Sequence, residues 1–256
     1  MIVSGGSNVG YSLDSELLSK KLNMETFNTS FSISHDYEFV LNYIASNLQK
    51  GDIFLYIPEF DNYYVNNENM MSHTLCVSIY NHPSFFSYLS FTQKVNFLTK
   101  VPKINTLLLY KNLKYQFLHT QKSSLQTNSR GDYIHHLDKS KTWKKTEITR
   151  YEKYQYNHKL SNHFKNAMLK AQQMAESKGA TFYVSYPLIA ASQYDVRFKE
   201  DLEKFYKNTT IKLIGSPENY IFQDDLIYDH PYHTTKKGRE IRTEILIKDL
   251  QKVLKL

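Results

Sequence analysis

The sequence contains a single cysteine, Cys76, among its 256 residues. One thiol cannot form a disulfide within the chain, and it cannot supply the ligands of a cysteine-rich zinc or iron–sulfur site. We therefore predict a fold without a disulfide framework and a site without metal ligands. Such cysteine usage is compatible with a reducing compartment.

Long hydrophobic runs are also lacking. No apolar stretch approaches the roughly 20 residues that a helix needs to span a bilayer. No basic segment followed by an apolar one marks a signal peptide. We therefore expect a cytoplasmic protein with no integral membrane segment, associated with a membrane only if the chain is part of a longer parent.

The sequence also lacks nucleic-acid-binding motifs. The formal net charge is +7, which favours anionic partners such as nucleic acid, an acidic polysaccharide or a phosphate-bearing donor. The sequence has no helix-turn-helix, zinc-finger or RNA-binding signature, and its lysines are spread along the chain. We interpret the excess charge as a generally basic surface and expect no nucleic-acid partner.

Strand-like and helix-like segments alternate at both ends of the chain, and 41% of the residues are hydrophobic, which is enough for a packed core. The expected strands are 1–4, 26–28, 53–57, 181–186 and 211–214, and the expected helices are 12–22, 36–49, 160–178, 196–206 and 237–254. Ser12 is expected to cap the first helix. The alternation predicts an α/β fold, a three-layer α/β/α flavodoxin-like sandwich with about five parallel strands.

The alternation is lost between residues 61 and 150, where many of the 21 tyrosines lie. Helix-like spacing remains only at 84–99 and 104–118. We expect one domain over residues 1–256, with a tyrosine-rich, mostly helical insertion or cap at about 61–150.

Ser7 follows the first expected strand and two glycines, Gly5 and Gly6. Ligands of open parallel sheets bind beyond the carboxyl ends of the strands, so Ser7 stands where such a fold has its site. The stretch is not a G-x-S-x-G elbow, because Val9 occupies the last position. Taken alone, it is also compatible with an ordinary Gly/Ser turn.

A catalytic serine needs a base and an orienting carboxylate. Asp229 and His233 stand four residues apart just before the last expected helix. The simplest alternative is a surface loop whose histidine caps that helix. His230 is a competing base, and His35 is a more remote one.

Five motifs occur in order along the chain: "GGSN" at 5–8, "KGDIFLYIPEF" at 50–60, "NSRGD" at 128–132, "FYVSYPLIAASQY" at 182–194 and "YDHPYHTTKKGREIRT" at 228–243. Together they resemble the SGNH (GDSL-like) hydrolase superfamily. More narrowly, they are similar to a bacterial SGNH-like branch found in surface-polysaccharide gene clusters.

The resemblance implies that Ser7 is the nucleophile, His233 the general base and Asp229 the residue that orients the imidazole. It implies a serine-dependent acyl-ester enzyme acting on carbohydrate, foremost an O-acetyltransferase that modifies a bacterial surface polysaccharide. No bound cofactor is implied, and acetyl-CoA is the expected acyl donor. The alternatives are a carbohydrate O-acetylesterase of the same fold and a non-catalytic glycan-binding or assembly protein.

The sequence departs from the family pattern around the expected oxyanion hole. Besides the backbone N–H of Ser7, the second donor is expected at Ser30, where the family usually has glycine. The Asn-containing block is replaced by Pro58-Glu59-Phe60, so Asn8 and Asn128 are the candidates for a third donor. We interpret Glu59 as orienting a sugar hydroxyl or a basic residue, because an ionised carboxylate cannot donate a hydrogen bond. This weakened hole favours the non-catalytic alternative.

Overall fold

The computed structural model describes residues 1–30, 37–64, 71–118, 126–139 and 159–255. Its centre is a five-stranded parallel sheet in the order β2-β1-β3-β4-β6. These strands are β1 (Ile2–Gly5), β2 (Phe27–Asn28), β3 (Ile53–Ile57), β4 (Thr181–Ser185) and β6 (Lys212–Ile214). The predicted flavodoxin-like strand order and the predicted number of strands are confirmed.

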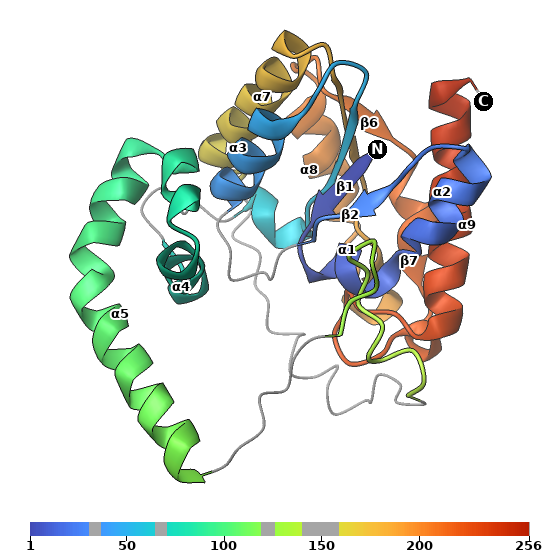
Figure 1. Ribbon diagram of the computed structural model, residues 1–256. Coiled ribbons are helices and arrows are strands. Elements are labelled where there is room, and N and C mark those ends of the chain that lie inside the picture. The colour runs from blue at the N-terminus through green and yellow to red at the C-terminus, as the bar shows by residue number, and fades with distance from the viewer. Residues whose placement is uncertain (31–36, 65–70, 119–125, 140–158, 256) are drawn as a thin grey trace.

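Helices cover both faces of the sheet, which confirms the predicted three layers (Figure 1). One face is covered by α3 (Tyr37–Asn47), α7 (Asn162–Ser177) and α8 (Arg197–Tyr206), and the other by α2 (Ser15–Leu22) and α9 (Lys236–Leu254). The larger core packs Phe39, Phe54 and Phe164 on the first face. The smaller core joins Leu18 and Leu246 on the second.

The helix expected at 12–22 is instead two helices, α1 (Ser7–Ser12) and α2. Ser12 is the last residue of α1, whereas Asp14 caps α2 by accepting a hydrogen bond from the Leu17 N–H at 3.0 Å. The prediction was wrong here because α1 depends on tertiary contacts. Six residues alone form a helix only marginally.

The insertion contains α4 (His73–Asn81), the 3₁₀ turns η1 (Phe60–Tyr63) and η2 (Pro83–Tyr88), and α5 (Phe91–Leu118). Helix α4 was not predicted, and α5 runs unbroken through Pro102, where two helices were expected. The buried side chains of Phe97 and Ile104 pack against the core on either side of the proline. This packing offsets the hydrogen bond that Pro102 cannot donate.

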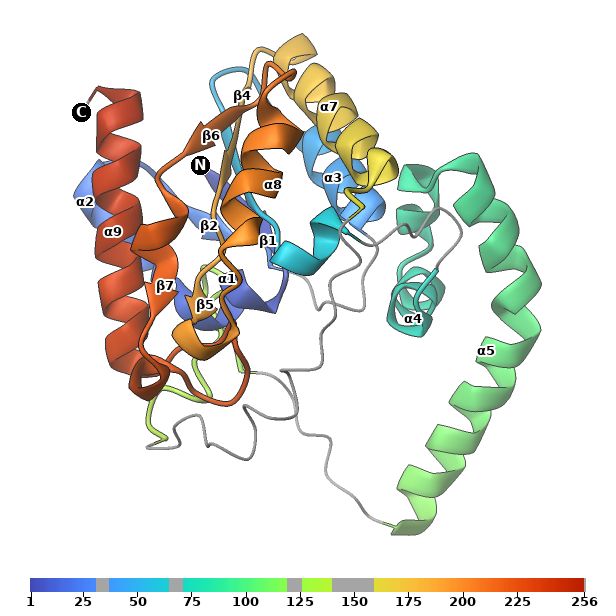
Figure 2. The same ribbon diagram turned by 180° about the vertical axis from the view of Figure 1, so that it is seen from behind.

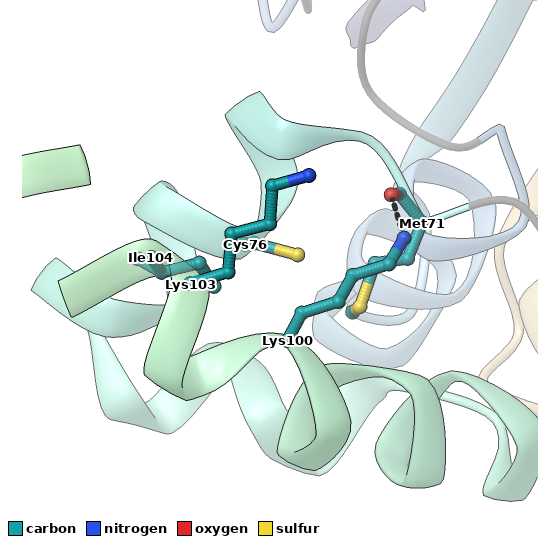
Figure 3. Close-up of a pocket in the computed structure, with 5 residues that line it drawn as sticks. All are labelled: Met71, Cys76, Lys100, Lys103 and Ile104. Carbon is teal, nitrogen blue, oxygen red and sulfur yellow. Dashed lines mark hydrogen bonds between the residues drawn. The ribbon is translucent and has the colours of Figure 1, made fainter. Parts of the chain in front are cut away.

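A pocket of about 150 Å³ lies between α4 and α5, shown in Figure 3. Met71, Cys76, Lys100, Lys103 and Ile104 line it. The Lys100 ammonium donates to the Met71 carbonyl oxygen at 2.7 Å. Both ribbon views place α4 and α5 on the α3 side of the molecule, away from α9 (Figures 1 and 2).

Residues 126–139 belong to the body of the fold and not to a cap. Asn28 donates its backbone N–H to the Arg130 carbonyl at 2.8 Å, and Tyr133 donates its own to the Gly10 carbonyl at 3.0 Å. Gly131 has φ +91°, and a Cβ there would lie 2.0 Å from the Asn28 carbonyl oxygen. Only glycine therefore fits this turn.

A second, two-stranded parallel sheet was not predicted. It pairs β5 (Ile189–Ala190) with β7 (Ile221–Phe222), and the 3₁₀ turns η3 (Ala191–Gln193), η4 (Pro217–Tyr220) and η5 (Asp224–Leu226) flank it. Across the described ranges, no helix has the length and apolar character to span a bilayer. The same ranges contain no cluster of three or more potential metal ligands.

Candidate active site

Ser7 is the first residue of α1, directly beyond the carboxyl end of β1. The two preceding glycines let this turn pack against the end of β3. A Cβ on Gly5 would lie 2.3 Å from the Ile57 carbonyl oxygen, and a Cβ on Gly6 would lie 2.5 Å from Glu59 Oε1. Both distances are too short for any side chain, so the glycines bring Ser7 close to β3.

The structure brings Ser7, His233 and Asp229 together. Ser7 Oγ lies 2.8 Å from His233 Nε2, and His233 Nδ1 lies 2.8 Å from Asp229 Oδ1. The loop between η5 and α9 holds the pair, because Tyr228 donates its backbone N–H to the His233 carbonyl at 2.9 Å. This is the hydrogen-bond order of a serine nucleophile, a base and an orienting carboxylate.

Burial affects the protonation of His233. Desolvation lowers the pKa of His233, and the hydrogen bond that His233 donates to Asp229 only partly opposes that effect. The imidazole is therefore neutral at pH 7. With Nδ1–H donated to Asp229, Nε2 presents a lone pair to the Ser7 hydroxyl, which is the state that a general base requires.

The structure separates His233 from the competing base His230. The His230 ring centre is 4.8 Å from that of His233, and His233 is the histidine within hydrogen-bond distance of Ser7. The geometry thus favours His233 over His230. His35 lies outside the described residues.

Tyr11 packs against His233, a contact that the sequence analysis did not predict. Its ring stacks on the His233 ring with centroids 3.8 Å apart and planes 11° apart. Its hydroxyl lies 3.2 Å from His135 Nε2, and its carbonyl oxygen lies 3.1 Å from His136 Nε2. The only available signal was its position four residues after Ser7, on the same side of a helix.

Replacing Tyr11 with alanine is expected to lower kcat roughly fivefold with little change in KM, since a ring stack is worth about 1 kcal/mol. Tyr11→Phe keeps the stack and loses only the hydrogen bond to His135, so it should retain most of the rate. Steady-state kinetics on p-nitrophenyl acetate would compare the two. Equal losses in both variants would contradict a role for the stack.

A buried polar network ties α1 to α9. Asp132 is fully buried and accepts hydrogen bonds from the Ser15 hydroxyl at 2.7 Å, Asn28 Nδ2 at 2.9 Å and Arg239 Nη2 at 3.1 Å. Arg239 Nε also donates to the Leu13 carbonyl at 2.6 Å. The network fixes the start of α2, and with it the loop that follows the nucleophile's helix.

Arg242, one turn further along α9, is fully buried as well. Its Nη1 donates to the Ser12 hydroxyl at 2.7 Å and to the Asn8 carbonyl at 3.3 Å. A cation at the carboxyl end of α1 complements the helix dipole. The "GREIRT" stretch thus supplies two arginines that position α1, a role that sequence reasoning did not assign to them.

The residues expected to form the oxyanion hole lie elsewhere or are engaged. The Ser30 N–H donates to Asn28 Oδ1 at 3.0 Å. Asn128 Nδ2 donates to Asp132 Oδ2 at 3.0 Å, within the 128–132 turn. Asn8 is fully buried, and its Nδ2 donates to the Ile57 carbonyl at 3.2 Å. The expectation that these three groups face an oxyanion is not met, because local partners use their donors.

The Glu59 carboxyl contacts the Ser7 hydroxyl. Its Oε1 lies 3.1 Å from Ser7 Oγ and 3.1 Å from the backbone nitrogen of Asn8. With 1% of its surface exposed, Glu59 cannot orient a sugar hydroxyl in the open site as expected. Burial raises the pKa of Glu59 to about 7, against the lowering effect of hydrogen bonds from Asn8 and Ser7.

Gly6→Ala is expected to reduce kcat/KM by about 10²-fold, the usual cost of one misplaced group at an oxyanion. The new Cβ would lie 2.5 Å from Glu59 Oε1 and push the carboxyl away from Ser7. Gly51→Ala is the control for a strained glycine substitution at another turn: Gly51 has φ +88° and a Cβ there meets nothing within 4 Å. It should lower the melting temperature and leave kcat/KM unchanged. If both variants kept wild-type rates, close packing of Gly6 on Glu59 would have no role in activity.

Comparison with known proteins adds little to the geometry. The chain matches no family model, and no curated protein matches it either. It aligns over 99% of its length, at 11% identity, with YxiM from Bacillus subtilis (TM-score 0.47) and with an acetyl xylan esterase, Est2A, from the rumen bacterium Butyrivibrio proteoclasticus (TM-score 0.36). The aligned part spans 56% of the first of those chains and 63% of the second.

Proposed function

We propose that this protein is a serine-dependent acyl-ester enzyme of the SGNH type. The observation that carries the proposal is the chain of two 2.8 Å contacts from Ser7 through His233 to Asp229. A protein that only binds glycans needs none of these three residues in this order. The geometry therefore favours an enzyme over the non-catalytic alternative.

The reaction follows from the hydrogen-bond order. His233 Nε2 takes the Ser7 proton as Oγ attacks the acyl carbonyl carbon, and the carbonyl π electrons move to the oxygen. The tetrahedral intermediate then collapses, and the leaving group departs with the proton from His233. An acyl group remains on Ser7 Oγ. An acceptor hydroxyl, deprotonated by His233, takes the acyl group in the second half of the reaction.

We propose a carbohydrate hydroxyl as the acceptor, which makes the protein an O-acetyltransferase acting on a bacterial surface polysaccharide. The ordered motifs from "GGSN" to "YDHPYH" support this assignment by their resemblance to that branch. Acetyl-CoA is the proposed donor, and the net charge of +7 suits its phosphates. If water is the acceptor, the same acyl-enzyme makes the protein an O-acetylesterase.

Two labelling experiments test the proposal in sequence. A fluorophosphonate should modify Ser7 in the wild-type protein, as peptide mapping by mass spectrometry would show, and should leave Ser7→Ala unmodified. Radiolabelled acetyl-CoA, supplied with candidate polysaccharides, should then place the label on sugar. Release of free acetate without transfer would identify an esterase. Absence of label from Ser7 with both reagents would contradict acyl-enzyme chemistry.

A further inference from the structure

Glu59 is an unusual neighbour for a nucleophile, because its buried carboxyl has no cationic partner. None of the described lysine or arginine side chains forms an ion pair with it, and its Oε2 is buried without a hydrogen-bond partner. An isolated ionised carboxylate is costly to bury, so such groups tend to become neutral.

We propose that Glu59 works as a neutral carboxylic acid that leaves the Ser7 hydroxyl hydrogen to His233. The inference rests on the acyl-ester chemistry proposed above. In this role Oε1 accepts the backbone N–H of Asn8, and the acidic hydrogen is on the buried Oε2.

The Ser7 hydroxyl has one hydrogen and two acceptors within reach. His233 Nε2 lies 2.8 Å from Ser7 Oγ, and Glu59 Oε1 lies 3.1 Å from it on another side. An ionised Glu59 is the stronger acceptor, since hydrogen bonds to charged groups are roughly twice as strong as neutral ones. Ionisation would therefore draw the hydrogen away from the base. A neutral Glu59 leaves it to His233.

The negative charge that develops when Ser7 attacks the acyl group also favours a neutral Glu59. When Oγ bonds to the acyl carbon, the carbonyl oxygen becomes negative one carbon atom away from Oγ. An ionised Glu59 would repel that charge, whereas a neutral carboxyl does not. A neutral Glu59 therefore gives a lower transition-state energy than an ionised one.

The groups around Glu59 favour the neutral form. Asp61, at the start of η1, faces it with a second negative charge and raises its pKa further. The groups that lower its pKa are uncharged: the backbone N–H groups of Asn8 and Ser7 and the Ser7 hydroxyl. His233, which reaches Glu59 only through Ser7, is neutral at pH 7 because its own pKa is lowered.

The test is the pH dependence of wild-type protein and Glu59→Gln, measured as kcat/KM on p-nitrophenyl acetate after subtraction of spontaneous hydrolysis. Wild-type activity should rise with pH as His233, whose pKa is lowered by burial, loses its proton, and then fall roughly tenfold per unit above about pH 7. Glutamine has an acceptor and a donor in place of Oε1 and Oε2–H. Glu59→Gln should therefore keep the acidic limb and lose the alkaline one.

Two further variants test whether the alkaline limb of the pH profile depends on Glu59. Asp61→Asn removes a charge that raises the Glu59 pKa, so its alkaline limb should move to lower pH without loss of a group touching Ser7. Glu218→Gln changes a carboxylate of the η4 turn and should leave the wild-type profile intact.

Melting temperatures give a readout that does not need activity. A carboxyl with a raised pKa in the folded state stabilises the fold at low pH and loses that contribution as pH rises through about 7. The Tm of the wild type should therefore fall relative to Glu59→Gln between pH 5 and pH 8. If the wild-type protein showed no Ser7-dependent activity but its Tm still followed this course, the proposed function alone would be overturned. A folded, Ser7-reactive Glu59→Gln that is inactive throughout, or that keeps the alkaline limb, would overturn the role of Glu59.

Discussion

Ser7→Ala is expected to lower kcat on p-nitrophenyl acetate by at least about 10⁴-fold, because the variant has no oxygen that could carry the acyl group. His233→Ala should lose a similar factor, since without Nε2 the Ser7 proton has no acceptor of suitable pKa. The double variant should be no slower than either single one, because residues that act as one unit give strongly non-additive losses.

Matched controls separate this result from general damage. Ser87→Ala and His82→Ala change exposed residues of the same types in and beside η2, and both should keep wild-type rates. Ser7→Ala should also keep the wild-type melting temperature to within a few degrees, because it removes a single hydroxyl. Wild-type turnover in Ser7→Ala would show that the nucleophile lies elsewhere.

Asp132→Ala is expected to destabilise the fold by about 3–5 kcal/mol, the usual cost of breaking a buried ion pair by removing one partner. The charge left behind is that of Arg239, whose Nη2 lies 3.1 Å from Asp132 Oδ2 and whose side chain is 7% exposed. Its other ion pair, to Asp14 Oδ2, is longer at 3.6 Å. Ser15, Asn28 and Asn128 would each lose an acceptor as well. For a chain of this size, thermal unfolding should shift downward by about 10 °C.

Asp138→Ala is the control for this variant, because Asp138 lies in the same segment and is exposed. It should unfold at the wild-type temperature. Asp132→Asn keeps an acceptor oxygen and loses only the charge. Its melting temperature should therefore lie between those of Asp132→Ala and Asp138→Ala. If Asp132→Ala proved as stable as Asp138→Ala, the network joining α1, α2 and α9 would not contribute to stability as we expect.

The parallel sheet could be predicted because apolar runs and helical spacing place its strands and most of the helices. The rule that sites lie beyond the carboxyl ends of parallel strands placed Ser7 at the site. The choice of His233 over the other histidines came from the family resemblance. The sequence did not predict α1, α4, the unbroken α5 or the β5–β7 sheet. Helix α1, for example, depends on tertiary contacts such as Arg242 to Ser12.

The oxyanion donors were less predictable, for a physical reason. An amide can donate wherever a partner lies, so its residue type does not reveal which partner folding provides. Asn128 donates to Asp132, four residues away, and Asn8 donates to the Ile57 carbonyl at the end of β3. Glu59 was interpreted as an ionised carboxylate on residue type alone. Burial, which decides whether a carboxyl keeps its charge, is a property of the whole fold.

The proposed nucleophile and its base stand 226 residues apart in the sequence. Ser7 therefore leaves the ribosome well before His233 and the arginines of α9. Until those residues emerge, the proposed base is not beside Ser7. On the proposed mechanism, a nascent chain gains reactivity towards thioesters only once α9 can dock.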